Sequence, residues 1–341
     1  MTVARTQTAS HYLPDRDDHL RDLRFLRTQW VVLAHDGAVP EPGDNFALDI
    51  LGCPILLRRA ADGGIAAFLN ACPHRGGPLA WPGQSNTRLL QCRYHGWTFR
   101  GDGRLIEPVG FGRERRDIQC TAPSLHPLRI ECRDGLILAC LNAGADSAPP
   151  PVPAELTTRL ASARLVATES FPAECNWKLY AENWLEAYHI QSLHLGLSDD
   201  IQGETYRVDC GPVWAEHSAM PDKGTYGGYW AFLYPATAIN FFTDGFSIEQ
   251  ISPVAETRCV VQYQFYRFTD TASMAGIDAE IALTRTVTAE DIAAAEHVQK
   301  SLAAGIFEQG FVSKDREPGI LALHDFLKER LPSDTRLRNE P

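Results

Sequence analysis

Two short segments of the chain each pair a cysteine with a histidine, and they constrain its fold more than any other feature. The first is Cys72-Pro-His74, and the second, after seventeen intervening residues, is Cys92-Arg-Tyr-His95. Two thiolates and two imidazoles form a complete ligand set, either for a [2Fe-2S] cluster with mixed ligands or for a structural zinc ion. Because four such side chains must converge on one centre, the two segments are expected to lie together as loops of one domain.

The order of the residues within each segment favours the cluster over zinc. Each segment gives the cysteine first and the histidine second, so each loop can reach both irons of a cluster held between them. The stretches 71–76 (ACPHRG) and 92–99 (CRYHGWTF) also closely resemble the Rieske domains of ring-hydroxylating and related oxygenases. This resemblance implies that a Rieske [2Fe-2S] cluster is bound by Cys72, His74, Cys92 and His95, with a zinc site as the alternative.

A proline-rich segment divides the chain. Its 341 residues are enough for two domains. Residues 146–153 contain four prolines and are expected to form a linker, because proline disfavours helix and interior strand. Before the linker, β-branched and aromatic runs alternate with turn residues and predict a small all-β domain over 25–145. Its expected strands are 30–35, 46–50, 55–59 and 65–69.

The remaining residues, 1–24 and 154–341, predict an α+β domain. After the linker, Trp177, Tyr180, Trp184 and Tyr188 recur at helical spacing, and the pattern predicts two further helices near the C-terminus. The expected fold class is therefore α+β, and the resemblance implies an N-terminal all-β Rieske domain followed by a catalytic domain of the helix-grip type. The expected elements of the second domain are strands at 230–233, 238–242, 246–252 and 259–268 and helices at 289–304 and 318–331.

A second group of ligand-type residues follows the linker. Glu182, Glu186 and His189 are spaced by four and three residues, which places them on one face of the expected helix. His194 lies five residues further, so both histidines can bind one metal only if the helix breaks between them, and Gly196 favours such a break. A surface helix with two ordinary histidines is the alternative.

The arrangement Glu186-x-x-His189-x-x-x-x-His194 is similar to the iron-binding signature of the same oxygenases. The resemblance extends from about residue 12 to residue 331 and implies that His189 and His194 bind a mononuclear Fe(II), with a carboxylate as third ligand. The best match for that carboxylate is Asp291, and Glu290 is next. A competing interpretation takes Thr288 and Asp291 as a helix capping box.

The resemblance also implies roles for the residues around this signature. Asn183 and Glu186 correspond to residues that act in catalysis. Glu186 is similar to the bridging acid that links an iron-ligating histidine of one subunit to a cluster-ligating histidine of its neighbour, here His189 and His95. This implies an oligomer, with a homotrimer favoured and a hexamer or an α3β3 assembly as alternatives.

The composition narrows the possible partners. A net charge of −11 weakens the case for binding nucleic acid or an anionic membrane, and the polar start of the chain lacks the apolar core of a signal peptide. We therefore expect a cytoplasmic protein. No Gly-x-Gly-x-x-Gly follows a predicted strand and no plant-type ferredoxin cysteine pattern is present, so NAD(P)H must act through a separate reductase, with a ferredoxin as a further possible partner.

The substrate is the least constrained part of the prediction. We expect an enzyme that uses O2 to hydroxylate an aromatic or heteroaromatic compound. The alternative is an oxidative N- or O-demethylase or monooxygenase acting on a small amine or quaternary ammonium compound, and two other classes are a Rieske electron carrier and a zinc-stabilised binding module. The aromatic residues expected around the iron fit a ring or an ammonium group, and they are Tyr226, Tyr229, Trp230, Phe232, Phe241, Phe242 and Phe246.

Overall fold

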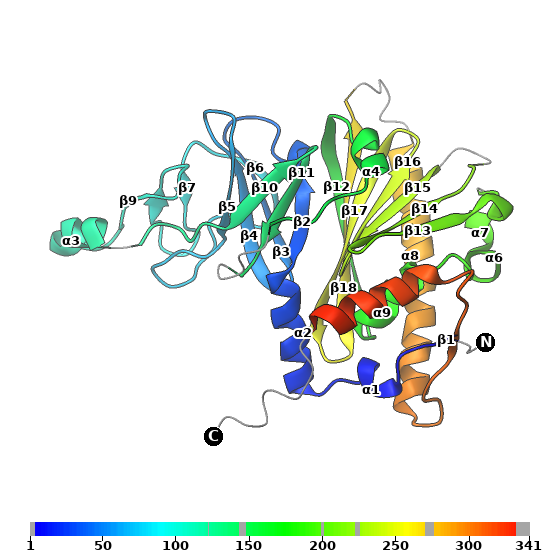
Figure 1. Ribbon diagram of the computed structural model, residues 1–341. Coiled ribbons are helices and arrows are strands. Elements are labelled where there is room, and N and C mark those ends of the chain that lie inside the picture. The colour runs from blue at the N-terminus through cyan, green and yellow to red at the C-terminus, as the bar shows by residue number, and fades with distance from the viewer. Residues whose placement is uncertain are drawn as a thin grey trace. The chain divides into compact units, whose positions relative to one another are not determined.

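The computed structural model describes residues 4–121, 123–142, 148–198, 201–221, 226–269 and 276–331. The chain separates into two compact units, each shown with its elements in Figure 1. The β unit comprises Arg27–Pro149 and Ser162–Leu165, and the α+β unit comprises Met1–Leu26, Pro150–Ala161 and Val166–Pro341. In the described part of the chain, no helix is long and apolar enough to cross a membrane.

Small antiparallel sheets build the β unit, with strand orders β5-β4-β3-β6, β10-β11-β2 and β7-β8-β9. A core of buried residues that includes Leu56, Phe68 and Phe99 also contains Cys72 and Cys92, so the two cysteine loops are anchored in the core. The elements are β2 (Trp30–His35), β3 (Asp44–Ile50), β4 (Cys53–Arg59), β5 (Ile65–Leu69), β6 (Gly83–Asn86), β7 (Leu90–Gln91), β8 (Thr98–Phe99), β9 (Leu105–Glu107), α3 (Arg115–Thr121), β10 (Arg129–Arg133) and β11 (Leu136–Cys140).

A seven-stranded sheet of order β12-β18-β17-β16-β15-β14-β13 forms the centre of the α+β unit. Its strands from β13 to β18 pair antiparallel. These strands are β12 (Ala163–Ala173), β13 (Arg207–Cys210), β14 (Trp214–Ser218), β15 (Tyr226–Leu233), β16 (Thr237–Phe242), β17 (Gly245–Ala255) and β18 (Arg258–Phe268), and a separate pair joins β1 (Ala4–Arg5) to β19 (Phe311–Val312).

Helices pack against this sheet (Figure 1). The short helix α5 contacts β17 and β18 and also the longer helices α8 and α9. The α+β unit therefore has the antiparallel sheet packed with helices that the sequence predicts. Its helices are α1 (Ala9–Tyr12), α2 (Arg16–Thr28), α4 (Ala154–Arg159), α5 (Trp177–Trp184), α6 (Ile190–Leu193), α7 (Leu195–Ser198), α8 (Ile277–Ala303) and α9 (Pro318–Arg330).

A buried ion pair holds α5 to the N-terminal helix α2. Lys178 Nζ lies 2.5 Å from Asp22 Oδ2, and their side chains are 4 % and 2 % exposed. Lys178 also donates to the backbone carbonyl of His11. The charge that α5 buries is therefore compensated by an acid from the start of the chain.

Two helical expectations are wrong in their extent. The expected aromatic helix continues to Tyr188, but α5 ends at Trp184, and Tyr188 is exposed. The expected helix at 289–304 is instead α8, which begins at Ile277 and has Gly276 as its N-cap. The sequence pattern therefore predicted only the C-terminal part of α8.

The limits of the two units differ from the domain limits expected from the sequence. Residues 162–165, assigned to the second domain from the sequence, group with the β unit. In the expected linker, residues 148–153 have no regular structure, and residues 146 and 147 lie outside the described residues.

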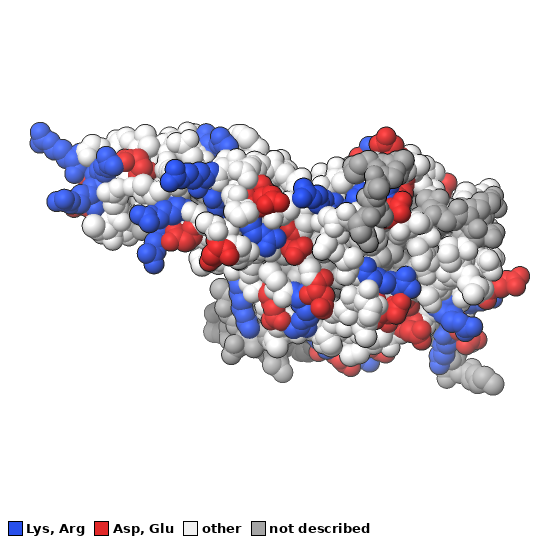
Figure 2. All heavy atoms as spheres, turned by 90° about the horizontal axis from the view of Figure 1, so that it is seen from above, with Lys and Arg blue, Asp and Glu red and all other residues white. Residues whose placement is uncertain are grey.

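Charged side chains of both signs cover the face of the molecule shown in Figure 2. Lys and Arg gather at the end of the β unit that bears α3, where Arg113, Arg115 and Arg116 are exposed. The acidic excess of the chain is therefore not spread evenly over its surface.

Candidate metal centres and their cavity

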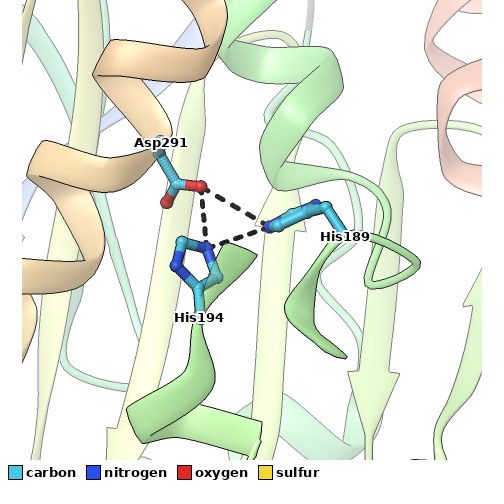
Figure 3. Close-up of side chains that lie close together, drawn as sticks. All are labelled: His189, His194 and Asp291. Carbon is cyan, nitrogen blue, oxygen red and sulfur yellow. Dashed lines mark hydrogen bonds and ion pairs between the residues drawn. The ribbon is translucent and has the colours of Figure 1, made fainter. Parts of the chain in front are cut away.

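Two histidines and an aspartate converge in the α+β unit (Figure 3). His194 Nε2 lies 2.9 Å from Asp291 Oδ1, and His189 Nε2 lies 3.1 Å from His194 Nε2 and 3.5 Å from Asp291 Oδ1. The three ligand-type atoms are all within 4.8 Å of one another. Two imidazole nitrogens and one carboxylate oxygen form the donor set of a facial Fe(II) site, which leaves further positions open.

The outer ring nitrogens of both histidines meet carboxylates. His189 Nδ1 lies 2.6 Å from Glu186 Oε1, and His194 Nδ1 lies 2.7 Å from Glu290 Oε2. A carboxylate can only accept here, so each Nδ1 donates to its acid, and each Nε2 is the atom that would offer its lone pair to a bound metal. The bonds from both Nδ1 atoms to carboxylates therefore fit a metal at the point where the two Nε2 atoms converge.

The third member of the group is held by an amide. Asn183 Nδ2 donates to Asp291 Oδ1 over 2.6 Å. Asn183 lies on α5 and Asp291 on α8, so the bond links the two helices at the site. Asn183 therefore orients the carboxylate through a direct hydrogen bond.

The end of α5 positions both histidines. The backbone leaves the helix after Trp184, and Glu186 then accepts from the backbone N–H groups of Tyr188 and His189. A single turn of helix, α6, follows, with His189 as its N-cap and His194 as its C-cap. The expected break between the two histidines is therefore wrong: a helical turn joins them, and the helix breaks before His189 and at His194.

Glu182 does not share a face with Glu186 and His189, contrary to the sequence prediction. Because α5 ends at Trp184, Glu182 points into the protein instead. Its carboxylate accepts from Tyr12 Oη at 2.9 Å and lies 2.9 Å from His324 Nε2. It joins α5 to α1 and α9.

The capping-box interpretation of Asp291 is also wrong. Thr288 lies inside α8, and its hydroxyl is 2.9 Å from Tyr263 Oη instead of capping the helix. Glu290, the second candidate for the carboxylate, contacts the outer nitrogen of His194 and lies away from the point of convergence. Of the two acids, the structure brings Asp291 into the group.

Charge around His194 favours its protonated form when no metal is present. Burial lowers the pKa of the His194 imidazole, but hydrogen bonds and charge from Asp291 and Glu290 outweigh burial and raise that pKa overall. Negative charge at this point equally attracts a divalent cation, which would displace the proton.

The two cysteine loops in the β unit lie against each other. The rings of His74 and His95 are 4.8 Å apart, and the Cys72 and Cys92 thiols interact directly. Backbone bonds shape both loops, from Gly76 N to Cys72 O and from Gly96 N to Cys92 O. The four predicted cluster residues are therefore brought together.

Several features of these loops fit a bound cluster. In the described part of the chain, the buried Nδ1 atoms of His74 and His95 have no hydrogen-bond partner, although buried ring nitrogens normally have one. Any Cβ added at Gly77 would lie 3.0 Å from Cys92 Sγ, so only glycine leaves this space open. Burial raises the pKa of the Cys72 thiol to about 11, a cost that a bound iron removes by holding the thiolate.

A cavity of about 100 Å³ adjoins the candidate iron site. Of the seven aromatic residues expected around the iron, Tyr226, Trp230 and Phe242 line it, and the other four do not. Further lining residues were not predicted from the sequence, and they include Trp184, Tyr206, Asn240, Glu249, Tyr263 and Thr284. A volume of this size is well below the roughly 300–1,000 Å³ of pockets for drug-sized ligands, so the cavity suits a small group.

One lining residue is a buried acid. Glu249 is 1 % exposed, and burial raises the pKa of its carboxyl to about 7. The sequence signal for Glu249 is a charged residue in the middle of the otherwise uncharged stretch 246–252. Buried strands rarely contain a charged residue unless it has partners.

Family models match both parts of the chain. The "Rieske [2Fe-2S] domain" matches residues 29–110, and the "ring hydroxylating alpha subunit (catalytic domain)" matches residues 160–333, just over half of the chain. The expected α+β fold, with a Rieske domain before a catalytic domain, is confirmed.

Known proteins resemble the chain over nearly its whole length. The carnitine monooxygenase oxygenase subunit of Escherichia coli (strain K12) is 26 % identical over 340 residues, covering 92 % of this chain and 90 % of that protein. The chloroplastic choline monooxygenase of Beta vulgaris is 26 % identical over 331 residues, covering 90 % of this chain and 73 % of that protein. The crystal structure of the quaternary ammonium Rieske monooxygenase CntA with L-carnitine superposes with a TM-score of 0.80 at 23 % identity, covering 97 % of this chain and 96 % of that one.

These matches establish the class of enzyme and its cofactors. The protein is an oxidoreductase with a Rieske [2Fe-2S] cluster and a mononuclear iron, and it uses O2, a small-molecule substrate and electrons from a reductase. The electron-carrier and zinc-module alternatives are therefore wrong. The chain belongs to the Rieske non-haem iron oxygenases, as a terminal oxygenase with the alpha-subunit type of catalytic domain.

Proposed function

We propose that this oxygenase oxidises a small methylated amine or quaternary ammonium compound, at a carbon next to nitrogen or at a hydroxyl-bearing carbon one position further. The observation that carries the proposal is the cavity beside the iron group, which combines a small volume, an aromatic lining and the buried acid Glu249. Aromatic faces attract ammonium groups through their quadrupoles. Similarity to a carnitine monooxygenase subunit and to a choline monooxygenase also supports an ammonium substrate over an aromatic one.

We assign the ligands in the same proposal. Cys72, His74, Cys92 and His95 hold the cluster, and the iron is held by His189, His194 and Asp291. When bound, the cluster would supply electrons and the Fe(II) would supply the chemistry of O2 activation. The chain's own residues orient the ligands: Glu186 and Glu290 fix the imidazoles, and Asn183 fixes the carboxylate.

The substrate's change follows from the chemistry of a carbon next to nitrogen. Inserting one oxygen atom into such a C–H bond consumes O2, two electrons and two protons and releases water. When the hydroxylated carbon is next to nitrogen, it loses the amine and becomes an aldehyde. When it lies one carbon further and already bears a hydroxyl group, as in choline, the second oxygen makes it a hydrated aldehyde. The aromatic cavity wall excludes water from the reacting carbon.

We also propose that Glu186 connects the two kinds of centre between subunits. Its Oε1 bonds His189, and the partner for its other side would be His95 of a neighbouring subunit in a trimer. The published description of CntA likewise refers to inter-subunit electron transfer in that enzyme. A cytoplasmic location remains a prediction.

A substrate panel tests the proposal. The purified protein, loaded with cluster and Fe(II), is incubated with a compatible reductase, NADH and O2, and each product is measured against the NADH consumed. Choline-type and carnitine-type ammonium compounds should give an aldehyde in proportion to NADH. A product from single-ring aromatic compounds, with none from the ammonium compounds, would overturn the proposal.

A further inference from the structure

We propose that Glu249 is the anionic part of the substrate site and selects a fully methylated ammonium group. This inference rests on the proposed function, which gives the substrate class but no residue that recognises the charge. The position of Glu249, its hydrogen bonds and the surfaces around it support the inference.

Glu249 lies in the middle of β17, in the wall of the cavity that also contains His189, His194 and Asp291. Every residue of β17 from Gly245 to Pro253 is buried. A carboxylate is costly at such a place unless it is compensated by charge or hydrogen bonds. Its presence in the wall of the reaction cavity therefore calls for an explanation beyond packing.

Only uncharged groups bond the carboxylate within the described residues. Tyr180 Oη donates to Oε1 at 2.9 Å, while Trp184 Nε1 and Asn240 Nδ2 donate to Oε2 at 3.2 and 3.0 Å. These donors orient the carboxylate and stabilise its ionised form, but they do not neutralise its charge. A positive ligand in the cavity would do so.

The same bonds determine which cation fits. With these three donors in place and Tyr263 also bonding it, the carboxylate has little capacity left for an N–H group of a primary or secondary amine. A methylated ammonium group offers no N–H and needs only the electrostatic field, which acts at several ångströms in a site shielded from water. The bonding pattern of Glu249 therefore fits a quaternary nitrogen best.

Aromatic faces complete such a site. Trp184, Tyr206, Tyr226, Trp230 and Tyr263 line the cavity together with Glu249. Tyr263 pairs directly with Glu249 across β17 and β18, and Trp184 bonds it. Aromatic rings around a quaternary ammonium group give a binding energy that increases when water is excluded.

A purely structural role for Glu249 predicts something different from a recognition role. As a structural acceptor, Glu249 would only hold Tyr180, Trp184 and Asn240 in place, and its charge would not matter to the ligand. As a recognition residue, its charge would distinguish a cation from an uncharged molecule of the same shape. The test must therefore compare two such ligands.

Choline and 3,3-dimethylbutan-1-ol form the matched pair, because the second replaces the quaternary nitrogen by carbon. Their dissociation constants are measured by calorimetry on the full protein with cluster and Fe(II), in the absence of reductant. The wild type should bind choline roughly tenfold or more tightly than the alcohol, and Glu249→Gln should lose most of that preference and keep only the part that the aromatic faces give. Iron content and the visible spectrum of the cluster verify that the variant is intact.

Tyr180→Phe is the control variant. It removes one hydrogen bond to Glu249 and so raises the pKa of the carboxyl further, but at about pH 9 Glu249 should stay ionised, and the preference for choline over the alcohol should persist there. If Glu249→Gln keeps the preference of the wild type, the assignment of Glu249 is refuted while the proposed function stands. If the wild type itself shows no preference for choline and also forms no product from ammonium compounds, the proposed function fails instead.

Discussion

At the scale of single residues, the two acids next to each other on α8 have separate tasks. Asp291 faces the point where His189 and His194 converge, while Glu290 bonds the outer nitrogen of His194. Neighbouring residues on a helix point in directions about 100° apart, which explains the division. Asp291 is therefore expected to bind iron, and Glu290 is expected to hold the His194 ring in place.

Asp291→Ala should therefore lose the mononuclear iron and keep the cluster. Glu290→Ala should keep iron but bind it roughly 10- to 100-fold more weakly, because it removes only a bond to a ligand. Iron per chain after dialysis, together with the visible absorption of the cluster, measures both. Iron loss in Glu290→Ala but not in Asp291→Ala would reverse the assignment.

The charge of Glu249 should also show itself in the pH dependence of binding. Burial raises the pKa of its carboxyl to about 7, while hydrogen bonds from Asn240, Tyr263 and Tyr180 lower that pKa and the charge of Asp291 raises it. The two tyrosines stay uncharged, since burial keeps their own pKa values well above 10.

Glu249 is ionised above its pKa, so choline affinity should rise as the pH increases from about 6 to about 8 and then level off. Titrations of choline at several pH values measure this, and the dependence should disappear in Glu249→Gln. An affinity that falls over the same range would contradict a carboxylate in this role.

The sequence identifies the candidate ligands more readily than the cavity residues for a physical reason. His189, His194 and Asp291 belong to short motifs, whereas Glu249 and Tyr206 reach the cavity only because a sheet and a loop bring distant segments together. Asn183 lies between these cases, since the motif includes it but its bond to Asp291 depends on the packing of α5 against α8.

At the scale of elements, the most informative difference from the sequence prediction is the end of α5. The aromatic periodicity extends through Tyr188, but Leu185 caps the helix, and Glu186 bonds backbone N–H groups beyond it. A side chain that competes for backbone donors ends a helix without any glycine or proline signal. The periodicity of apolar residues shows which face of a helix is buried, so it could not predict that α5 ends at Trp184.

The position of α5 depends on the buried pair between Lys178 and Asp22. Asp22→Ala leaves the Lys178 ammonium buried without its acid, so the free energy of unfolding should fall by about 3–5 kcal/mol. Urea denaturation followed by circular dichroism measures the loss.

Asp18→Ala provides the matched control on the same helix. Asp18 pairs with Arg21 at partly exposed positions, so its removal should change stability by about 0–1 kcal/mol. Equal losses in the free energy of unfolding would show that burial does not determine how much the Lys178–Asp22 pair stabilises the protein.

At the scale of the whole molecule, the two kinds of centre belong to separate compact units. The cluster residues lie in the β unit and the iron residues in the α+β unit. The strand pattern before the proline-rich segment predicted the β unit well, because short buried strands have strong local signals. The grouping of residues 162–165 with that unit depends on tertiary contacts that no local pattern records.

The proposed electron transfer between subunits predicts the behaviour of Glu186→Gln. The amide keeps the size of the side chain but removes the charge that bonds His189 and, in the proposal, His95 of a neighbouring subunit. The variant should retain both metal centres and lose nearly all turnover. Normal turnover in a fully loaded variant would refute the bridge, and sedimentation analysis would show whether the assembly is unchanged.

The central claim is that cluster electrons and iron together oxidise a methylated ammonium compound, and a single-turnover experiment tests it most directly. The cluster is reduced without oxygen, the reductant is removed, and O2 is added with or without choline. We predict that the cluster is reoxidised with formation of the aldehyde when both are present, and that iron-free Asp291→Ala forms none. Cluster oxidation without any aldehyde in the loaded wild type, or equal aldehyde from Asp291→Ala, would contradict the account.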